Sequence, residues 1–405
     1  MFGSKLTGTS TAPIIVRQYP GERATLDSTG LQGSTISLTG SYTWYWGFEV
    51  ASSSTARTST QTGPWPTDVN CNPSIATPNA GTGNKFINLV VHDNPLGFGL
   101  WSANTDLETY GCLVYYNGWN APDRGHGHGI YAQNLTGYKK ILDNIIFYNT
   151  DHGMQAYGSA AAGVNNFTVD GNIFYENSRL FTAYTSGRNL LIGGDAVAQN
   201  PLVRNNCIYR AVAGSAGGTS DFYLGYTSGA SGAVMQNNYI VCTALFASNL
   251  TGMTMDSNYL CGTVSGLNTA TYPNNTFTTT RPTTGTKVVV RPNTYEPGRA
   301  NIAIYNWSLA NTVTVDLTGA GLNAGDTYEL HNTMNYFGDV ITGTYAGGTI
   351  TVPMTGRTVA APSGLPAPAS PFPQFGAFVL LKTGSGTPPN TAPTITSIAN
   401  QIITA

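Results

Sequence analysis

The phrases NIIFYN (144–149), GNIFYEN (171–177), NNCIYRA (205–211), NNYIVC (237–242) and SNYLCG (257–262) repeat one pattern that decides the fold. Earlier copies read NLVVHDN (88–94) and GCLVYYN (111–117). Each is an apolar and aromatic run of strand length, bounded by Asn or Gly and without helical periodicity. The aligned asparagines, Asn144, Asn172, Asn206, Asn238 and Asn258, are 28, 34, 32 and 20 residues apart. The phrase is therefore constant although its period is irregular.

A unit of this size cannot bury its own apolar face, so neighbouring units must stack as in a solenoid. Asparagine at the recurrent corner tolerates left-handed backbone and lets each side-chain amide bond to the asparagine of the next coil. We therefore expect parallel strands at the repeat phrases, with Asn144, Asn172, Asn206 and Asn238 in one ladder. The uneven spacing predicts loops of varying length.

Composition supports an all-β chain. Of the 405 residues only 9% are charged and 48 are glycine, and Asn, Thr, Ser and Gly all rank poorly in helix interiors. The net charge of −2 gives no reason to expect nucleic acid or an anionic membrane as a partner. No apolar run reaches the roughly 18 residues that span a bilayer.

The five cysteines have no CxxC or metal-finger spacing, so we expect buried free thiols. As an alternative, Cys242 and Cys261 lie in consecutive coils and could form a disulfide in an exported protein. The opening MFGSKLTGTS lacks the apolar core of a signal peptide, and an extended segment follows at once. We therefore expect the chain to begin inside a domain.

Changes of pattern along the chain predict four parts. Coils occupy residues 1–268 and carry a polar insertion, 52–83, that is too long for a tight corner. A Thr/Pro/Asn-rich stretch, 269–286, is typical of a linker or strap. Short alternating strands over 287–383 predict a β-sandwich. Residues 384–405 resemble a linker and the first strand of a truncated Ig-like module.

The repeat phrases, together with APIIVRQYPGE (12–22), resemble the right-handed parallel β-helix of the pectate-lyase-like superfamily over about residues 10–270. The stretch RPNTYEPGRANIAIYNWS (291–308) is similar to the β-sandwich that follows catalytic domains in bacterial carbohydrate-active proteins, and TAPTITSIANQ (391–401) resembles the opening of bacterial Ig-like or cadherin-like repeats. The resemblance implies a right-handed parallel β-helix followed by a β-sandwich, in a secreted or cell-surface monomer that acts on a polysaccharide. Because this superfamily includes lyases, hydrolases, epimerases, esterases and phage adhesins, the activity must be argued from a site.

The segments WNAPDRGHGHGIYAQN (119–134) and TDHGMQAYG (150–158) hold the candidate site. Aligned, they place His128 and His152 at equivalent positions of adjacent coils, with FGLWSA (98–103) one coil earlier. Alternation then sends Leu100, Ile130 and Met154 to the core. The outward stripe predicted in this way consists of Trp101, Tyr131 and Gln155, extended by Gln133 and Tyr157. We expect the 52–83 insertion to flank this face.

An outward stripe of aromatic rings and amides suits a sugar chain, since rings stack on pyranose faces while amides bond to hydroxyls. The preceding loop adds Asp123, Arg124 and His126 as a carboxylate, a uronate-binding guanidinium and a proton carrier. β-Elimination from a uronate needs a base, a cation on the carboxylate and an acid at the leaving oxygen. We assign these roles to His128 or His152, Arg124 and Tyr131.

Several alternatives stay open from the sequence. The Gly-His/Asp-Gly phrases also suit a structural corner, and the pattern matches neither the calcium-binding aspartates and arginine base of pectate lyases nor the clustered aspartates of polygalacturonases. Calcium could replace the arginine, although Asp93, Asp106, Glu108 and Asp151 show no recognised ligand spacing. A polysaccharide lyase on an acidic glycan is our first expectation. A hydrolase or uronate epimerase on the same groove, or a non-catalytic glycan-binding or adhesion protein, are the alternatives.

Overall fold

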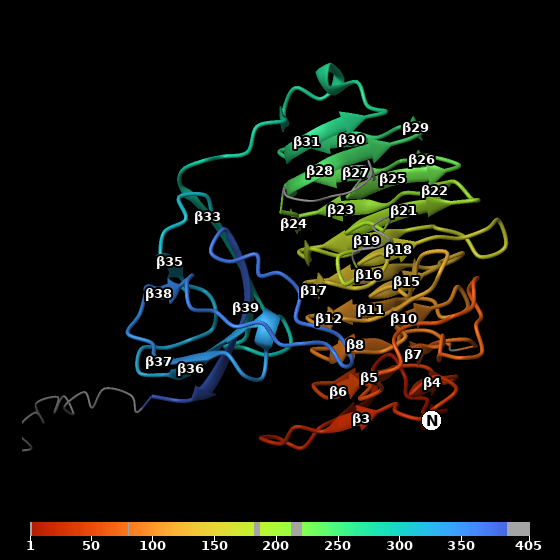
Figure 1. Ribbon diagram of the computed structural model, residues 1–405, viewed down its shortest axis with the longest axis horizontal. Coiled ribbons are helices and arrows are strands. Elements are labelled where there is room, and N and C mark those ends of the chain that lie inside the picture. The colour runs from red at the N-terminus through yellow and green to blue at the C-terminus, as the bar shows by residue number, and fades with distance from the viewer. Residues whose placement is uncertain (1, 80, 182–186, 212–220, 387–405) are drawn as a thin grey trace, which may run out of the picture.

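The computed structural model describes residues 2–79, 81–181, 187–211 and 221–386. It shows a tall stack of parallel coils with a smaller antiparallel unit beside it (Figure 1). The predicted Ig-like start falls on 387–405, outside the described residues. None of the helices in these described ranges is long and apolar enough to cross a membrane.

Each coil contributes strands to three columns, in which every strand pairs in parallel with its counterpart one coil away. The first column contains β2 (Ile14–Arg17), β5 (Thr43–Trp46), β8 (Lys85–Ile87), β11 (Leu107–Tyr110), β16 (Lys139–Leu142), β19 (Phe167–Asp170), β23 (Leu202–Arg204), β27 (Val234–Gln236) and β30 (Thr254–Asp256). The second contains β3 (Thr25–Asp27), β6 (Glu49–Ala51), β9 (Val90–His92), β12 (Leu113–Tyr115), β17 (Ile145–Phe147), β20 (Ile173–Tyr175), β24 (Cys207–Tyr209), β28 (Tyr239–Ala247), β31 (Tyr259–Ser265) and β32 (Thr276–Thr278). The third contains β1 (Phe2–Ser4), β4 (Ile36–Leu38), β7 (Pro73–Ala76), β10 (Leu96–Leu100), β15 (Ile130–Ala132), β18 (Met154–Ala156), β21 (Leu190–Gly194) and β25 (Phe222–Thr227), and continues into the last residues of β28 and β31.

Short elements complete the coils. They are β22 (Ala198–Gln199), β26 (Ala230–Ser231), β29 (Leu250–Thr251), the hairpin β13 (Trp119–Asn120) and β14 (Gly125–His126), and the 3₁₀ turn η1 (Thr269–Thr271). The parallel β-helix predicted from the repeat phrases is therefore confirmed.

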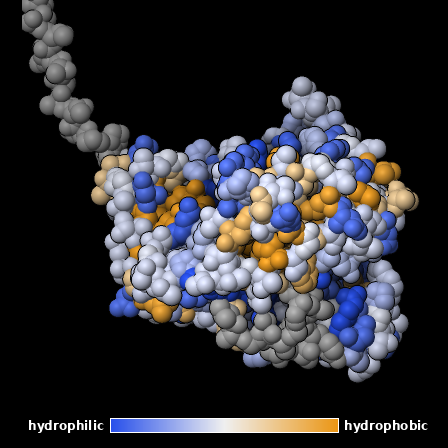
Figure 2. Space-filling view, turned by 90° about the horizontal axis from the view of Figure 1, so that it is seen from above, coloured by the Kyte–Doolittle hydropathy of each residue, from blue (hydrophilic) through white to orange (hydrophobic). Residues whose placement is uncertain are grey.

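At the end of the stack near β30 and β31, apolar side chains including Met253, Val264 and Leu267 line a hollow. The view from above shows hydrophobic patches in this part of the molecule (Figure 2).

The predicted asparagine ladder is present. Each side-chain amide donates to the amide oxygen of the next coil, and each backbone N–H does the same, through Asn144, Asn172, Asn206, Asn238, Asn258 and finally Asn275. The coil stack thus continues into the stretch that we predicted as a linker, because Asn275 ends the ladder and β32 pairs with β31.

The positive φ expected of the ladder asparagines belongs instead to the residue before each one. Asp143, Gly171, Asn205, Asn237 and Ser257 have φ between 50° and 71°. Turning the chain and bonding to the next coil are therefore separate tasks for neighbouring residues. A second ladder at another corner, not predicted from the sequence, runs through Asn94, Asn117, Asn149, Asn177 and Asn189.

The C-terminal unit consists of a five-stranded antiparallel sheet, β33 (Thr286–Pro292), β34 (Ala300–Asn306), β39 (Phe375–Gly384), β36 (Thr327–Asn332) and β37 (Val340–Thr344), and a two-stranded sheet, β35 (Thr312–Asp316) and β38 (Thr349–Pro353), with the 3₁₀ turn η2 (Thr333–Asn335). Alternation along β34 sends Ile302 and Ile304 toward the two-stranded sheet and Ala303 and Tyr305 toward the coils.

The coil face that meets this unit carries stacked rings from the second column. Tyr115, Phe147 and Tyr175 stack at centroid distances of 4.9 and 4.6 Å, and Phe375 of β39 stacks on Tyr209 at 4.4 Å. All of these rings are buried. The second column is thus covered by the C-terminal unit, whereas the third column carries the candidate site.

Candidate active site

The third column places the two predicted histidines side by side. Ile130 pairs with Met154 and Tyr131 with Gln155, so the preceding corners of the two coils coincide. The rings of His128 and His152 lie 5.2 Å apart between centroids. Ile130 and Met154 are fully buried in the core, as alternation predicts, whereas the side chains of Tyr131 and Gln155 face outward and are partly exposed.

The register one coil earlier differs from our alignment by two residues. Phe98 pairs with Ile130 and Gly99 with Tyr131, so Trp101 lies beyond the end of β10. A two-residue shift keeps every side chain on its own face, and hydrophobic alternation could not reveal it. Trp101 still reaches the predicted stripe, because its ring lies 5.4 Å from that of Tyr131. A Cβ at Gly99 would lie 2.7 Å from Cγ of Pro73 and 3.3 Å from Cζ2 of Trp101, so glycine leaves room for both side chains.

These side chains border a cleft of about 380 Å³. Trp101, Tyr131 and His128 form its floor on the coil stack, and Arg124 and His126 contribute from the hairpin β13–β14 and its turn. Trp119, Pro64, Trp65, Cys71, Leu96 and Gly127 complete the lining. Five of the ten predicted site residues thus meet in one cleft, two of them from the hairpin side.

The hairpin orients His126. Trp119 and His126 are cross-strand neighbours, and their rings stack at 4.1 Å with an angle of 2° between the planes. Nε2 of His126 lies 3.2 Å from Oδ1 of Asp123, while Oδ2 of Asp123 accepts a hydrogen bond from the backbone N–H of Gly63 at 3.3 Å. Asp123 therefore connects His126 to the insertion.

The proton positions on the two cleft histidines follow from these partners. A carboxylate only accepts, so Nε2 of neutral His126 carries the hydrogen and Nδ1 keeps its lone pair. Nδ1 of His128 accepts the backbone N–H of His152 at 3.3 Å, so its Nε2 carries the hydrogen. Burial lowers the pKa of His126, and it lowers that of His128 to about 3, so both rings are neutral near pH 7. The cleft thus contains one histidine with a free lone pair and another that donates.

Asp151 lies behind the cleft and holds three neighbours. Its Oδ2 accepts from Nη1 of Arg124 at 2.9 Å and lies 3.9 Å from Nδ1 of His128, and its Oδ1 lies 2.7 Å from Nδ1 of His152. Burial alone would raise the pKa of Asp151, but His152, His128 and Arg124 together outweigh burial, and the pKa lies below its ordinary value. The carboxylate is therefore ionised. His128, Asp151 and His152 have the donor atoms and the spacing to hold a metal ion.

The remaining predicted residues lie outside the cleft lining. Gln133 donates to the Tyr131 hydroxyl at 3.3 Å, and Tyr157 donates to Asp195 at 2.9 Å farther along the stack. Burial raises the pKa of Tyr131, which keeps its hydroxyl protonated. Gln155 flanks Tyr131 on the next strand, while His152 is buried behind the floor.

The sequence predicted that the 52–83 insertion flanks the groove, but it did not identify Pro64, Trp65 and Cys71 as the residues of the insertion that line it. Residues 52–72 leave the stack, and β7 rejoins it within the range that we predicted as insertion. Asp68 organises this segment by accepting from Ser59 Oγ at 2.6 Å and from the backbone N–H of Thr60 at 2.7 Å. Val69 packs on Trp119. The only sequence signals were the length of the insertion and the tryptophan beside the histidine cluster.

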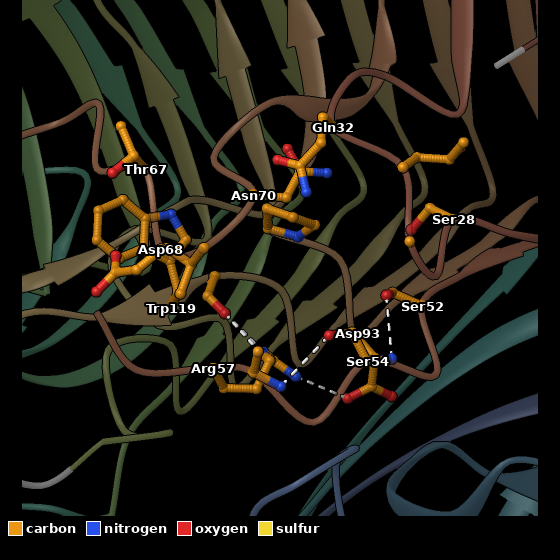
Figure 3. A pocket seen from close by; sticks show the side chains of 16 residues that line it. Ser28, Gln32, Ser52, Ser54, Arg57, Thr67, Asp68, Asn70, Asp93 and Trp119 are labelled. Atoms are coloured by element: carbon orange, nitrogen blue, oxygen red, sulfur yellow. Dashed lines mark hydrogen bonds and ion pairs between the residues drawn. The ribbon is translucent and has the colours of Figure 1, made fainter. Parts of the chain in front are cut away.

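A smaller polar cavity of about 150 Å³ adjoins the other side of Trp119. Figure 3 shows Arg57 directed toward Asp93, which it contacts at 3.0 Å. The same guanidinium donates to the carbonyls of Tyr116 and Gly118. Arg57 belongs to the insertion and these partners belong to the coils, so Arg57 anchors the insertion to the coils.

The described cysteines are all free, Cys242 and Cys261 included. Burial raises the pKa of Cys71, the cysteine that lines the cleft. Its thiol is therefore protonated near pH 7.

Comparisons with known proteins find similarity to pectate lyases and to a tailspike protein. No family model matches the chain. Pectate lyase L of Paenibacillus polymyxa (strain SC2) is 27% identical over 145 residues, which cover 32% of this chain, and the chain spans 32% of that relative. Among solved structures, pectate lyase Pel9A aligns with a TM-score of 0.44 and 16% identity over 68% of this chain and 64% of that one. The Dettilon tailspike protein aligns with a TM-score of 0.33 and 13% identity over 91% of this chain and 85% of that one. Pectate lyase L, which matches about a third of the chain, confirms the resemblance to pectate-lyase-like proteins that we inferred from the repeat phrases.

Proposed function

We propose that this protein is a secreted polysaccharide lyase that cleaves a uronate-containing glycan by β-elimination in the cleft above β10 and β15. One observation carries the proposal. A histidine with an open lone pair, an arginine and a tyrosine hydroxyl meet in one cleft with aromatic walls. The name of the relative, a pectate lyase, points to the same substrate class.

His126 is the base in this proposal. Asp123 holds Nε2 and Trp119 fixes the ring plane, so Nδ1 is left to take the proton from C5 of the uronate. Among the described residues, Nδ1 of His126 has no hydrogen-bond partner. This refines our assignment of the base to His128 or His152, because His128 presents an N–H and His152 lies behind the floor.

Arg124 neutralises the substrate carboxylate. Its side chain is 45% exposed, and within the described residues only Nη1 is used, by Asp151 and by the carbonyl of Gly125. The other N–H groups remain available for a bidentate contact with a uronate. His128 adds a neutral N–H donor on the same side, so negative charge that develops on the carboxylate meets two donors.

The elimination balances within these residues. Nδ1 of His126 takes the C5 proton, the electron pair forms the C4–C5 double bond, and the C4–O bond breaks. The Tyr131 hydroxyl on the cleft floor gives its proton to the leaving oxygen. The products are an unsaturated uronate and a shortened chain.

The test is a screen of the purified chain against acidic and neutral polysaccharides, with the ultraviolet absorbance of an unsaturated uronate as the signal. His126→Ala should lower turnover by about 10²–10⁴-fold. His331→Gln, far away in the C-terminal unit, is the matched control. New reducing ends without the chromophore would show that the protein is a hydrolase and not a lyase. Binding without any product would show that it is a glycan-binding protein.

A further inference from the structure

The cluster behind the cleft is composed of imidazoles and one carboxylate. One ligand atom each from His128, Asp151 and His152 lies within 4.8 Å of the others. Their side chains are 12%, 7% and 8% exposed. All three come from two adjacent corners of the coil stack, where the asparagine ladders hold the backbone in place.

In the part of the chain that the structure describes, the buried Nδ1 of His152 has no well-formed hydrogen bond. Nδ1 of His152 lies 2.7 Å from Oδ1 of Asp151, yet the geometry does not make a hydrogen bond. A buried polar atom without a hydrogen bond costs stability, so such atoms call for an explanation. A nitrogen and an oxygen 2.7 Å apart lie closer than two tetrahedral ligands of one ion, which are about 3.4 Å apart at bonds near 2.0–2.2 Å, so binding an ion would move these two atoms slightly apart.

Calcium does not fit these donors. It takes 6–8 oxygen ligands, whereas this cluster supplies two nitrogens and one carboxylate. Two imidazoles with a carboxylate suit zinc and related divalent transition ions, and three protein ligands leave a further position open. We therefore propose that His128, Asp151 and His152 bind a single divalent ion of the zinc class.

Arg124 supports this site from outside. It holds Oδ2 of Asp151 at 2.9 Å, which leaves Oδ1 directed at His152. Carboxylates that bind metals are usually held by such an outer hydrogen bond. The ion can enter from the cleft, because His128 lines the cleft floor. On binding, it takes the Nδ1 lone pair of His128 in place of the backbone N–H of His152, and Nε2 of His128 keeps its hydrogen. The site thus lies directly behind the proposed substrate-binding arginine.

Calorimetric titration of the chelator-treated chain with Zn²⁺ and, in parallel, with Ca²⁺ tests the proposal without any substrate, so its outcome is separate from that of the lyase assay. We expect a single Zn²⁺ to bind and Ca²⁺ to bind far more weakly. His128→Gln and His152→Gln should each weaken Zn²⁺ by more than about 100-fold, since even outer partners are worth about 10–100-fold.

His331→Gln is the control, because this buried imidazole also lies beside a carboxylate, that of Glu329 at 2.9 Å, and it should leave Zn²⁺ binding unchanged. Equal binding of Ca²⁺, or Zn²⁺ binding that survives in both cluster variants, would overturn the proposal. Should those variants fail to fold, pulsed electron paramagnetic resonance of the wild type with Co²⁺ decides. Coupling to two imidazole nitrogens supports the site, and its absence refutes it.

Discussion

Replacing Asn172 by alanine deletes a wholly buried side chain from the middle of the first ladder. This side chain makes five hydrogen bonds: it accepts from the backbone and side-chain amides of Asn144, and it donates to Asn206 and to the carbonyls of Ile141 and Asp170. The backbone N–H of Asn144 loses its acceptor in the variant. No solvent reaches this position to replace it.

The expected cost follows from these contacts. A buried hydrogen bond contributes about 0.5–1.5 kcal/mol, and a buried N–H without an acceptor costs about 1–3 kcal/mol. Because the five bonds share one side chain, we expect the free energy of unfolding to fall by about 3–6 kcal/mol. This is large for a single substitution.

Urea unfolding followed by circular dichroism measures the difference. Asn275→Ala is the matched control, because Asn275 accepts the same two hydrogen bonds from Asn258 but is only half-buried. Water can replace its bonds, so we expect a loss of about 1–2 kcal/mol there. Equal losses at the two positions would refute the view that burial makes the ladder stabilising.

Three further outcomes are expected. Burial opposes protonation of His92, but its bonds to Asp93 and Glu49 raise its pKa above 6.5. The contribution of His92 to stability is therefore complete below pH 6.5 and is lost as pH rises through the folded pKa. We expect the free energy of unfolding to be larger near pH 6 than near pH 8.5, and this difference should be smaller in His92→Gln. Trp65 lines the cleft and is 69% exposed, so Trp65→Ala should weaken polysaccharide retention in affinity electrophoresis by about 1 kcal/mol and leave the melting temperature unchanged. Tyr305 is wholly buried between the C-terminal sheet and the coils, so Tyr305→Ala should cost about 3–5 kcal/mol in urea, and a loss below 1 kcal/mol would argue against a packed interface.

The sequence predicted the coil stack because its signal is local. An asparagine followed by an apolar run marks both the corner and the strand, and each copy can be found alone. The ladder through Asn144 and Asn172 follows directly. Alternation placed Tyr131 outward, but it could not detect the two-residue shift at Trp101, since a shift of two preserves the face.

The walls of the cleft could not be predicted in this way, because they depend on contacts between distant segments. Asp123 meets Gly63 across 60 residues, and Arg57 meets Gly118 across 61. The pairing of Trp119 with His126 arises from a two-residue strand on each side of a turn, too short for a periodic pattern. The assignment of His128, His152 and the other site residues to particular steps stays a prediction for the experiments above.

The ladders also make the geometry of the coil stack independent of the number of residues between two corners. Amide-to-amide bonds are 2.9 Å long across the 12 residues from Asn177 to Asn189 and 3.0 Å across the 34 from Asn172 to Asn206. A corner can therefore gain or lose a loop without changing the position of the next coil. The coil stack can therefore stay unchanged in evolution while insertions such as 52–72 vary in sequence and length. The same corners are sites where loops from other proteins can be grafted to change the ligand specificity of the cleft.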